Sequence, residues 1–304
     1  MKYQFLAVAI SFLLAAAFTP NVISQTPAKK MKIFISADME GITGVVTGEQ
    51  LTPTGFEYQR FREIMTQEVN AAIDAAFAAG ATEIVVADSH GNGQNLLIEK
   101  LPKRVTLVRA WPRPLQMMQG IDETFAGAIF IGYHSGTHNP HGVRAHTLSS
   151  ANLANVKLNG VDVPEAGINA AIAGHFNVPV IMISGDYAAV KEATDLLGSI
   201  EGAVVKWNYG FHSARTIMPE AAQDLIRDKV RKAISRIGDF KPYKLTTPIR
   251  LDVQFKNYRP AEVLSYLSIV ERTDAHSIRF EAKDMIEMSK FITFMMNYES
   301  GLTP

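Results

Sequence analysis

The chain contains no cysteine among its 304 residues. That absence excludes disulfide bonds, a cysteine nucleophile and thiolate-bound metals, so any metal must be held by oxygen and imidazole ligands. An excess of charge of one sign is also missing, because 30 basic side chains balance 30 acidic ones. Since no basic patch stands out, nucleic acid is not an expected partner. The length and a hydrophobic content of 47% are typical of a globular chain with one large domain or two smaller ones.

Residues 1–24 have the pattern of a signal peptide. Lys2 supplies a positive start, and the apolar run FLAVAISFLLAAAF that follows is short for a membrane span. Pro20 ends this run, and Val22-Ile23-Ser24 fits a small-residue cleavage site. We therefore expect export to the periplasm or the medium, without a stable membrane anchor after cleavage. An uncleaved N-terminal anchor is the alternative, and no later segment is apolar enough to span a bilayer.

Hydrophobic periodicity predicts a strand–helix–strand unit at the start of the mature chain. Residues 32–37 run apolar like a strand, 56–79 place apolar groups at helical spacing, and TEIVVADSHG (82–91) is typical of a buried strand. Such a unit favours a parallel sheet. Further strands are expected in 105–110, 127–136 and 178–186, and further helices in 114–122, 165–176, 187–198 and 219–237. The predicted fold class is therefore α/β, with three α/β/α layers around a mostly parallel sheet.

A smaller α+β region is predicted to follow. Strands are expected in 248–255 and 277–284, and a final helix in 283–299. Earlier in the chain, LANVKLNGVDV predicts an antiparallel hairpin that turns at Asn159-Gly160. We therefore expect an α/β metal-binding catalytic domain over residues 31–210 and an α+β region over 211–304, and we leave open that the two intertwine.

Acidic and imidazole side chains follow three predicted strands at the point where each strand ends. Asp38 and Glu40 follow the first strand, His90 the second and His134 the fourth. The carboxyl ends of parallel strands meet at one edge of a sheet, where ligands bind. Because side chains two residues apart share one face of a strand, Asp38 and Glu40 can aim at one point. Their mutual repulsion favours a bound divalent cation, and this ligand set favours zinc, manganese or another borderline metal.

Each of these signals also has a plainer interpretation. An Asp-x-Glu at a strand end is often a solvated turn or a helix cap, and a single histidine there is often structural. What favours a shared site is that five of the eight histidines fall within residues 90–146, namely His90, His134, His138, His141 and His146. The loop over 135–147 is either an exposed segment or a cover that carries a proton shuttle.

Two further acids stay open on the residues alone. Glu165 begins a helix of small residues, where an acid often serves only as a partner of the helix dipole. Asp88 lies two residues before His90 and is a candidate to orient an imidazole from behind. Neither can be assigned as a metal ligand from its position in the sequence.

Longer motifs resemble one known family. In order along the chain they are KIFISADMEGITGV, IMTQEVNAAIDAAFAAGATEIVVADSHG, IDETFAGAIFIGYHSG, GVRAHT and VPEAGINAAIAGHFNVPVIMISGD, with FEAKDM near the end. Together they closely resemble the D-aminopeptidase family, some of whose members carry the name dipeptide transport protein. The resemblance covers nearly all of the mature chain.

The resemblance implies a two-zinc aminopeptidase that removes the N-terminal residue of short peptides, with D-amino acids expected and a water bridging both ions as nucleophile. It implies that one ion takes Asp38, Glu40 and His90, and that the other takes Asp38, His134 and Glu165. It further implies that His146 is the acid/base that passes a proton to the leaving amine. Family members assemble into rings stacked as a decamer, so the resemblance implies a homo-oligomer.

The chain departs from the family in two respects. The stretch between His134 and His146 is slightly longer than in a well-known member, and it carries the extra His138 and His141, whose roles stay open. Export is also a departure, because the family is expected in the cytoplasm. Two alternatives to the peptidase remain. One is an exported peptide-binding or transport protein, which needs no cluster of metal ligands. The other is a different dinuclear metallohydrolase, an amidase or a phosphoesterase, although Arg144 is the one basic residue beside the ligands.

Overall fold

The structure of the protein is a computed structural model that describes Met1 and residues 30–298. Residues 2–24 of the predicted signal peptide lie outside this described part, so cleavage and export stay predictions. Across the described part, no helix has both the length and the apolar character needed to cross a bilayer.

A seven-stranded sheet forms the larger part of the fold. In spatial order its strands are β3 (Val105–Val108), β2 (Glu83–Asp88), β1 (Lys32–Ala37), β4 (Phe125–Tyr133), β7 (Val180–Asp186), β8 (Glu201–Gly210) and β9 (Ser213–Thr216). All neighbouring pairs are parallel except the last, in which β9 runs antiparallel to β8. The predicted mostly parallel sheet is therefore confirmed.

The order of the strands reverses direction between β1 and β4. From β1 the chain moves outward to β2 and β3, and from β4 it moves the opposite way to β7 and β8. In open α/β sheets, ligands bind beyond the carboxyl ends of the strands at such a reversal. The segments that follow β1 and β4 therefore flank the place where a site is expected.

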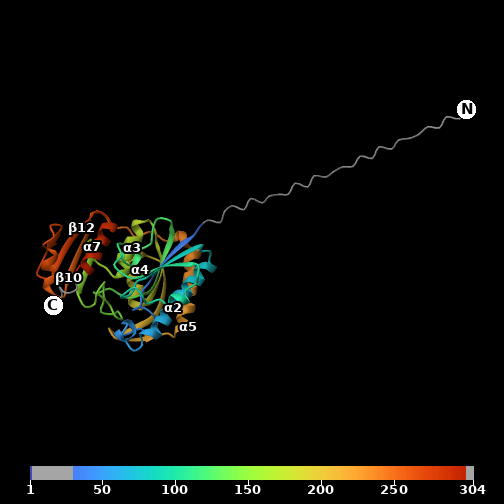
Figure 1. Cartoon of the computed structure of the whole chain (residues 1–304), viewed down its shortest axis with the longest axis horizontal. Coiled ribbons are helices and arrows are strands. Elements are labelled where there is room, and N and C mark those ends of the chain that lie inside the picture. The colour runs from blue at the N-terminus through green and yellow to red at the C-terminus, as the bar shows by residue number, and fades with distance from the viewer. Residues whose placement is uncertain (2–29, 299–304) are drawn as a thin grey trace.

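Helices cover both faces of the large sheet (Figure 1). Helices α2 (Tyr58–Ala78) and α5 (Pro219–Ser235) pack together on one face, and α3 (Glu165–His175) and α4 (Tyr187–Leu197) lie on the other, toward the smaller sheet. Helix α3 consists largely of small residues and is buried from Glu165 to Gly174, because it also packs against α7 (Met285–Asn297). The three predicted layers are thus present.

A smaller, antiparallel sheet lies beside the larger one and contacts α7 (Figure 1). In spatial order its strands are β11 (Val270–Arg272), β12 (Ser277–Ala282), β10 (Ile249–Phe255), β5 (Leu153–Leu158) and β6 (Val161–Asp162). Asn159 and Gly160 both have positive φ and form the tight turn between β5 and β6, so the predicted hairpin is confirmed. Because β5 and β6 precede residue 210 and the other strands follow it, both regions contribute to this sheet. The division of the chain at residue 210 stays a prediction.

Several elements differ from the sequence prediction. The segment 114–122, predicted as a helix, holds only the 3₁₀ turn η2 (Gln116–Met118). Gln116 and Gly120 have φ of 53° and 104°, which an α-helix excludes. Elements that the periodicity does not predict are β8, β9, β11, α1 (Gly48–Leu51), α6 (Tyr258–Leu264), η1 (Ile98–Lys100) and η3 (Ile237–Asp239).

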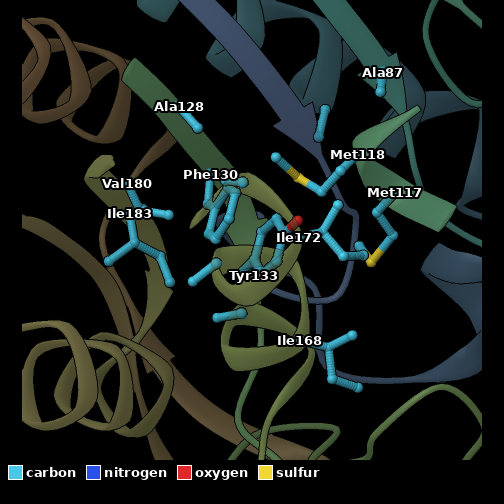
Figure 2. Close-up of a cluster of buried hydrophobic side chains, with 14 of the residues drawn as sticks. Ala87, Met117, Met118, Ala128, Phe130, Tyr133, Ile168, Ile172, Val180 and Ile183 are labelled. Carbon is cyan, nitrogen blue, oxygen red and sulfur yellow. The ribbon is translucent and has the colours of Figure 1, made fainter. Parts of the chain in front are cut away.

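An apolar core joins β4 to α3 (Figure 2). The rings of Phe130 and Tyr133 stack with centroids 4.5 Å apart, and Ile172 of α3 lies beside Tyr133. The Tyr133 hydroxyl donates to Ser36 Oγ at 2.7 Å and accepts from Asn169 Nδ2 at 3.0 Å. Both bonds are buried, and they tie β1, β4 and α3 together next to the residues that follow these strands.

Candidate metal centre

The carboxyl edge of the large sheet brings together the five predicted metal ligands. Asp38 and Glu40 follow β1, His90 follows β2, His134 follows β4, and Glu165 is the first residue of α3. All five side chains are buried, with exposed residue fractions between 1% and 8%. Residues that lie far apart in sequence thus meet because the strands before them are neighbours in the sheet.

Two glycines allow the turn after β1 to seat against the end of β4. The Gly41 amide donates to the Gly132 carbonyl at 2.7 Å, and a Cβ on Gly41 would lie 2.0 Å from the Tyr133 carbonyl oxygen. Gly132 itself has φ of +71°, and a Cβ there would lie 2.2 Å from the Asp38 carbonyl oxygen. Both positions therefore require glycine.

Asp38 lies between two groups of ligands. On one side, His90 Nδ1 lies 3.4 Å from Asp38 Oδ1 and 2.8 Å from Glu40 Oε2. On the other side, His134 Nε2 lies 3.3 Å from Asp38 Oδ2 and 3.5 Å from Glu165 Oε1. The two oxygens of one carboxylate thus face two different imidazoles, which is the arrangement that a bridging ligand needs.

Backbone carbonyls orient all three imidazoles at the centre. His90 Nε2 donates to the Leu51 carbonyl at 2.9 Å, and His134 Nδ1 donates to the Ser135 carbonyl at 3.0 Å. His146 Nδ1 donates to the Arg144 carbonyl at 2.8 Å. We assign these tautomers from the carbonyl partners, which only accept hydrogen bonds. The other nitrogen of each ring then faces the carboxylates with a lone pair available for a metal.

The residues present fit a metal on two grounds. Asp38 Oδ2 and His134 Nε2 are buried and lie 3.3 Å apart, but neither makes a hydrogen bond of good geometry in the described part of the chain, and such atoms are rare unless something else satisfies them. The ligand atoms of Asp38, Glu40 and His134 lie within 4.8 Å of one another, as do those of His134, His146 and Glu165. Oxygen and imidazole donors in this arrangement suit zinc.

The buried carboxylates and imidazoles at the centre shift one another's pKa values. Burial, followed by the Glu40 carboxylate, raises the pKa of Asp38 to about 6. Burial also opposes the charge on Glu40 and Glu165, but His90 and His134 hold the pKa of these two carboxyls below its usual value. Against burial, the carboxylates in turn raise the pKa of both imidazoles. The attraction between these buried carboxylates and imidazoles is therefore what shifts their pKa values in opposite directions from burial.

His146 reaches the same centre from the loop that follows β4. Its ring stacks on that of His134, with centroids 4.0 Å apart and planes 9° apart. His146 Nε2 lies 3.7 Å from Glu165 Oε1 and 4.0 Å from Glu40 Oε1. Burial and the neighbouring His134 lower the pKa of His146. His146 thus lies beside the predicted ligands, as the clustering of histidines in the sequence indicates. It is close enough to act as a proton carrier or as a further ligand.

Other residues that the sequence singles out do not join the centre. His138 Nε2 lies 3.4 Å from Glu192 Oε1, and His141 is exposed. The expectation that Asp88 orients an imidazole is wrong. Its Oδ2 accepts from the amides of Asn95 and Leu96 at 2.6 and 2.7 Å, so it fixes the loop after β2.

A cavity of about 370 Å³ opens over the centre. Its polar walls include all five predicted ligands and His146, and Trp111, Met117, Leu148 and Met296 add apolar surface. No lysine or arginine lines it among the described residues. The cavity thus gives access to the predicted ligands, whose three carboxylates are its acidic groups.

Lys206, which no sequence pattern singles out, supports the backbone of this centre. It lies on β8, is fully buried, and donates from Nζ to the carbonyls of Glu40, Ile42 and Val45. Burial lowers the pKa of Lys206 to about 8, although the nearby carboxylates of Asp186 and, to a smaller extent, Glu68 raise it. Lys206 therefore fixes the backbone that carries Glu40.

Lys206→Met is expected to weaken zinc binding by roughly 10–100-fold, as for other groups that orient a ligand. The variant keeps most of the side-chain volume but removes the ammonium group to which three carbonyls are bonded, so the Glu40 segment loses its fixed position. Chelator competition measures the affinity, and circular dichroism checks that the chain is folded. Lys191→Met, on the exposed side of α4, is the matched control. A folded Lys206 variant with the affinity of the control would show that Lys206 does not position Glu40.

The comparisons with known proteins all find D-aminopeptidases. A family profile described as D-aminopeptidase, peptidase family M55, matches residues 31–294. The chain is 37% identical over 260 residues to the D-aminopeptidase of Bacillus subtilis (strain 168), covering 84% of this chain and 93% of that protein. Among solved structures it is similar to the "Zn-dependent D-aminopeptidase DppA from Bacillus subtilis, a self-compartmentalizing protease". The TM-score is 0.84 and the identity 33%, over 89% of this chain and 99% of that one.

Proposed function

This chain belongs to the D-aminopeptidase family, and from that membership we propose that it is a dinuclear zinc enzyme that removes an N-terminal D-residue from short peptides. The predicted enzyme class, a metallo-aminopeptidase, is confirmed by the family and its relatives. The number of ions and the preference for D-residues are what the proposal adds.

One observation carries the proposal of two ions. Asp38 presents Oδ1 to His90 and Oδ2 to His134, so one carboxylate serves both groups of ligands. Asp38, Glu40 and His90 would hold one ion, and Asp38, His134 and Glu165 the other. When bound, such ions supply an activated water and Lewis-acid polarisation of the scissile carbonyl.

His146 supplies the proton for the leaving amine in this proposal. Because its Nδ1 is held by the Arg144 carbonyl, Nε2 is the atom that transfers the proton. Because its pKa is lowered, the imidazole of His146 is neutral near pH 7, so it must accept a proton before it donates one to the leaving amine. One of the ions, or a carboxylate beside it, would hold the free N-terminal amine, which selects an aminopeptidase over an endopeptidase.

The cavity argues against a phosphoesterase. A phosphate ester carries negative charge, and no lysine or arginine lines the cavity among the described residues. Arg144, the one basic residue that the sequence offers, hydrogen-bonds to His212 Nε2 at 3.0 Å and lies over the Phe211 ring. A protein that only binds peptides would not need the buried cluster of metal-type ligands, which argues against that alternative as well.

Assembly and location complete the proposal. The solved relative is described as self-compartmentalizing, so we propose that this chain forms a homo-oligomer, with a decamer as the expected size. From the signal-peptide pattern of residues 1–24 we also propose that the enzyme acts in the periplasm or outside the cell. Its substrates would then be short peptides found there.

Hydrolysis of matched D- and L-aminoacyl amides tests the function, with zinc content measured on the same sample. We expect release of the amino acid from the D-amide, about two zinc ions per chain, and loss of activity when a chelator removes them. Faster hydrolysis of the L-amide would overturn the D-preference. A zinc-loaded protein that cleaves neither amide would overturn the peptidase assignment.

A further inference from the structure

A second cavity adjoins the cavity over the metal centre at His146. Its volume is about 530 Å³, and it shares His146 and Ser150 with the first cavity. Apart from these two residues, its walls come from the loop after β4, the start of β5, Phe211 and Lys256. A peptide bond placed at the metal centre would thus lie in the first cavity, with the second cavity next to it across His146 and Ser150.

The two cavities differ in the charged groups that line them. The acids of the first cavity are Asp38, Glu40 and Glu165, whose charge the proposed ions would neutralise. The second has no carboxylate among the described residues that line it, but it has the amine of Lys256 and the imidazole of His138. The C-terminus of a short peptide is a carboxylate, which matches the positive charge of Lys256.

Lys256 is held at the wall of the second cavity. It follows β10, its amide donates to the Asn152 carbonyl at 2.8 Å, and its Nζ donates to the Ser150 carbonyl at 2.6 Å. An ammonium group has three donors, so this one bond leaves two for a ligand. The position of the charge is therefore fixed by the same segment that separates the two cavities.

We propose that the second cavity binds the leaving part of the substrate and that Lys256 binds its C-terminal carboxylate. This assignment rests on the proposed function and specifies the substrate class as short peptides with a free C-terminus. In hydrolysis the water oxygen bonds to the carbonyl carbon, the C–N bond breaks, and the leaving nitrogen gains a proton. His146 faces both cavities, so the nitrogen that it protonates belongs to the part of the peptide in the second cavity.

The apolar and polar walls agree with this role. Leu153, Ala154 and Phe211 offer apolar surface to the side chain of the leaving residue. His138, which the sequence leaves without a role, lies at the same wall, where its contact with Glu192 orients the ring. His138, one of the two extra histidines of this loop, thus lines the second cavity and not the metal centre.

The test compares D-alanylglycine with D-alanylglycinamide, which differ only in the C-terminal carboxylate. We expect the zinc-loaded wild type to prefer the free carboxylate by roughly 10-fold or more in kcat/KM, mainly through KM, as for a hydrogen bond to a charged group. Lys256→Met should bring the ratio of the two substrates toward one, and Lys256→Arg should keep the preference. Lys244→Met, which lies at a separate cavity, is the control and should keep the wild-type ratio.

Each other result has a defined meaning. A wild type that cleaves both substrates equally well overturns the carboxylate subsite but leaves the peptidase intact. A Lys256→Met variant that is slower on both substrates with the wild-type ratio shows that Lys256 only holds the wall. A zinc-loaded wild type that cleaves neither overturns the proposed function, and the subsite with it.

Discussion

Asp38→Ala is expected to lose both zinc ions together and to retain less than about one-thousandth of the wild-type peptidase activity. The reason is geometric, because the two carboxylate oxygens face His90 and His134, one on each side. Mutation of a residue that only orients a ligand lowers metal affinity by roughly 10–100-fold, and mutation of a ligand that two ions share should lower it further. Metal analysis after dialysis, together with turnover of a D-aminoacyl amide, measures both effects.

Two variants sharpen this experiment. Asp38→Asn keeps the shape of the side chain but removes its charge, and it should also lose both ions. Asp74→Asn, on the exposed side of α2, makes the same chemical change away from the site and should bind metal as the wild type does. If Asp38→Ala lost one ion and kept the other, Asp38 would not be shared, and the two-ion arrangement proposed here would be wrong.

His146→Ala is expected to keep its full zinc content but to lose roughly 100-fold or more in turnover, because the leaving amine loses its proton donor. Its position allows a second role, since His146, His134 and Glu165 form a possible metal triad. Zinc analysis of the variant separates these roles: full content with slow turnover identifies a proton carrier, and loss of an ion identifies a ligand.

His141→Ala is the matched control for this experiment. His141 belongs to the same loop and is exposed, so its loss should change neither zinc content nor turnover. Unchanged turnover in a fully loaded His146→Ala variant would remove His146 from the chemistry. Slow turnover in both variants would instead point to a general effect of the loop.

The central part of the site could be predicted because parallel strands end at one edge. Asp38, His90 and His134 each follow a buried strand, and the order of the sheet brings these ends together. Glu165 is different, since an acid at a helix N-terminus has an ordinary explanation. Its Oε1 in fact accepts from the Leu148 amide at 2.7 Å and also faces His134, and only the family resemblance indicates the second contact.

What the sequence could not predict depends on distant neighbours. Lys206 belongs to β8, a strand that alternates weakly, and nothing local shows that its amine meets carbonyls more than 160 residues earlier in the chain. Asp88 looked like a partner of His90 because the two are separated by one residue. The strand ends at Asp88, however, so the chain turns and the two side chains do not share a face.

The path of the chain between His146 and Glu165 has a consequence for attempts to recombine this protein with relatives. The chain leaves the site, builds β5 and β6 into the smaller sheet, and returns to the site at the start of α3. A hybrid joined near residue 210 would pair one parent's β5 with the other parent's β10. A mismatch in that pairing would disturb the position of Glu165. Exchangeable modules in this fold must therefore carry residues 153–162 together with the C-terminal strands.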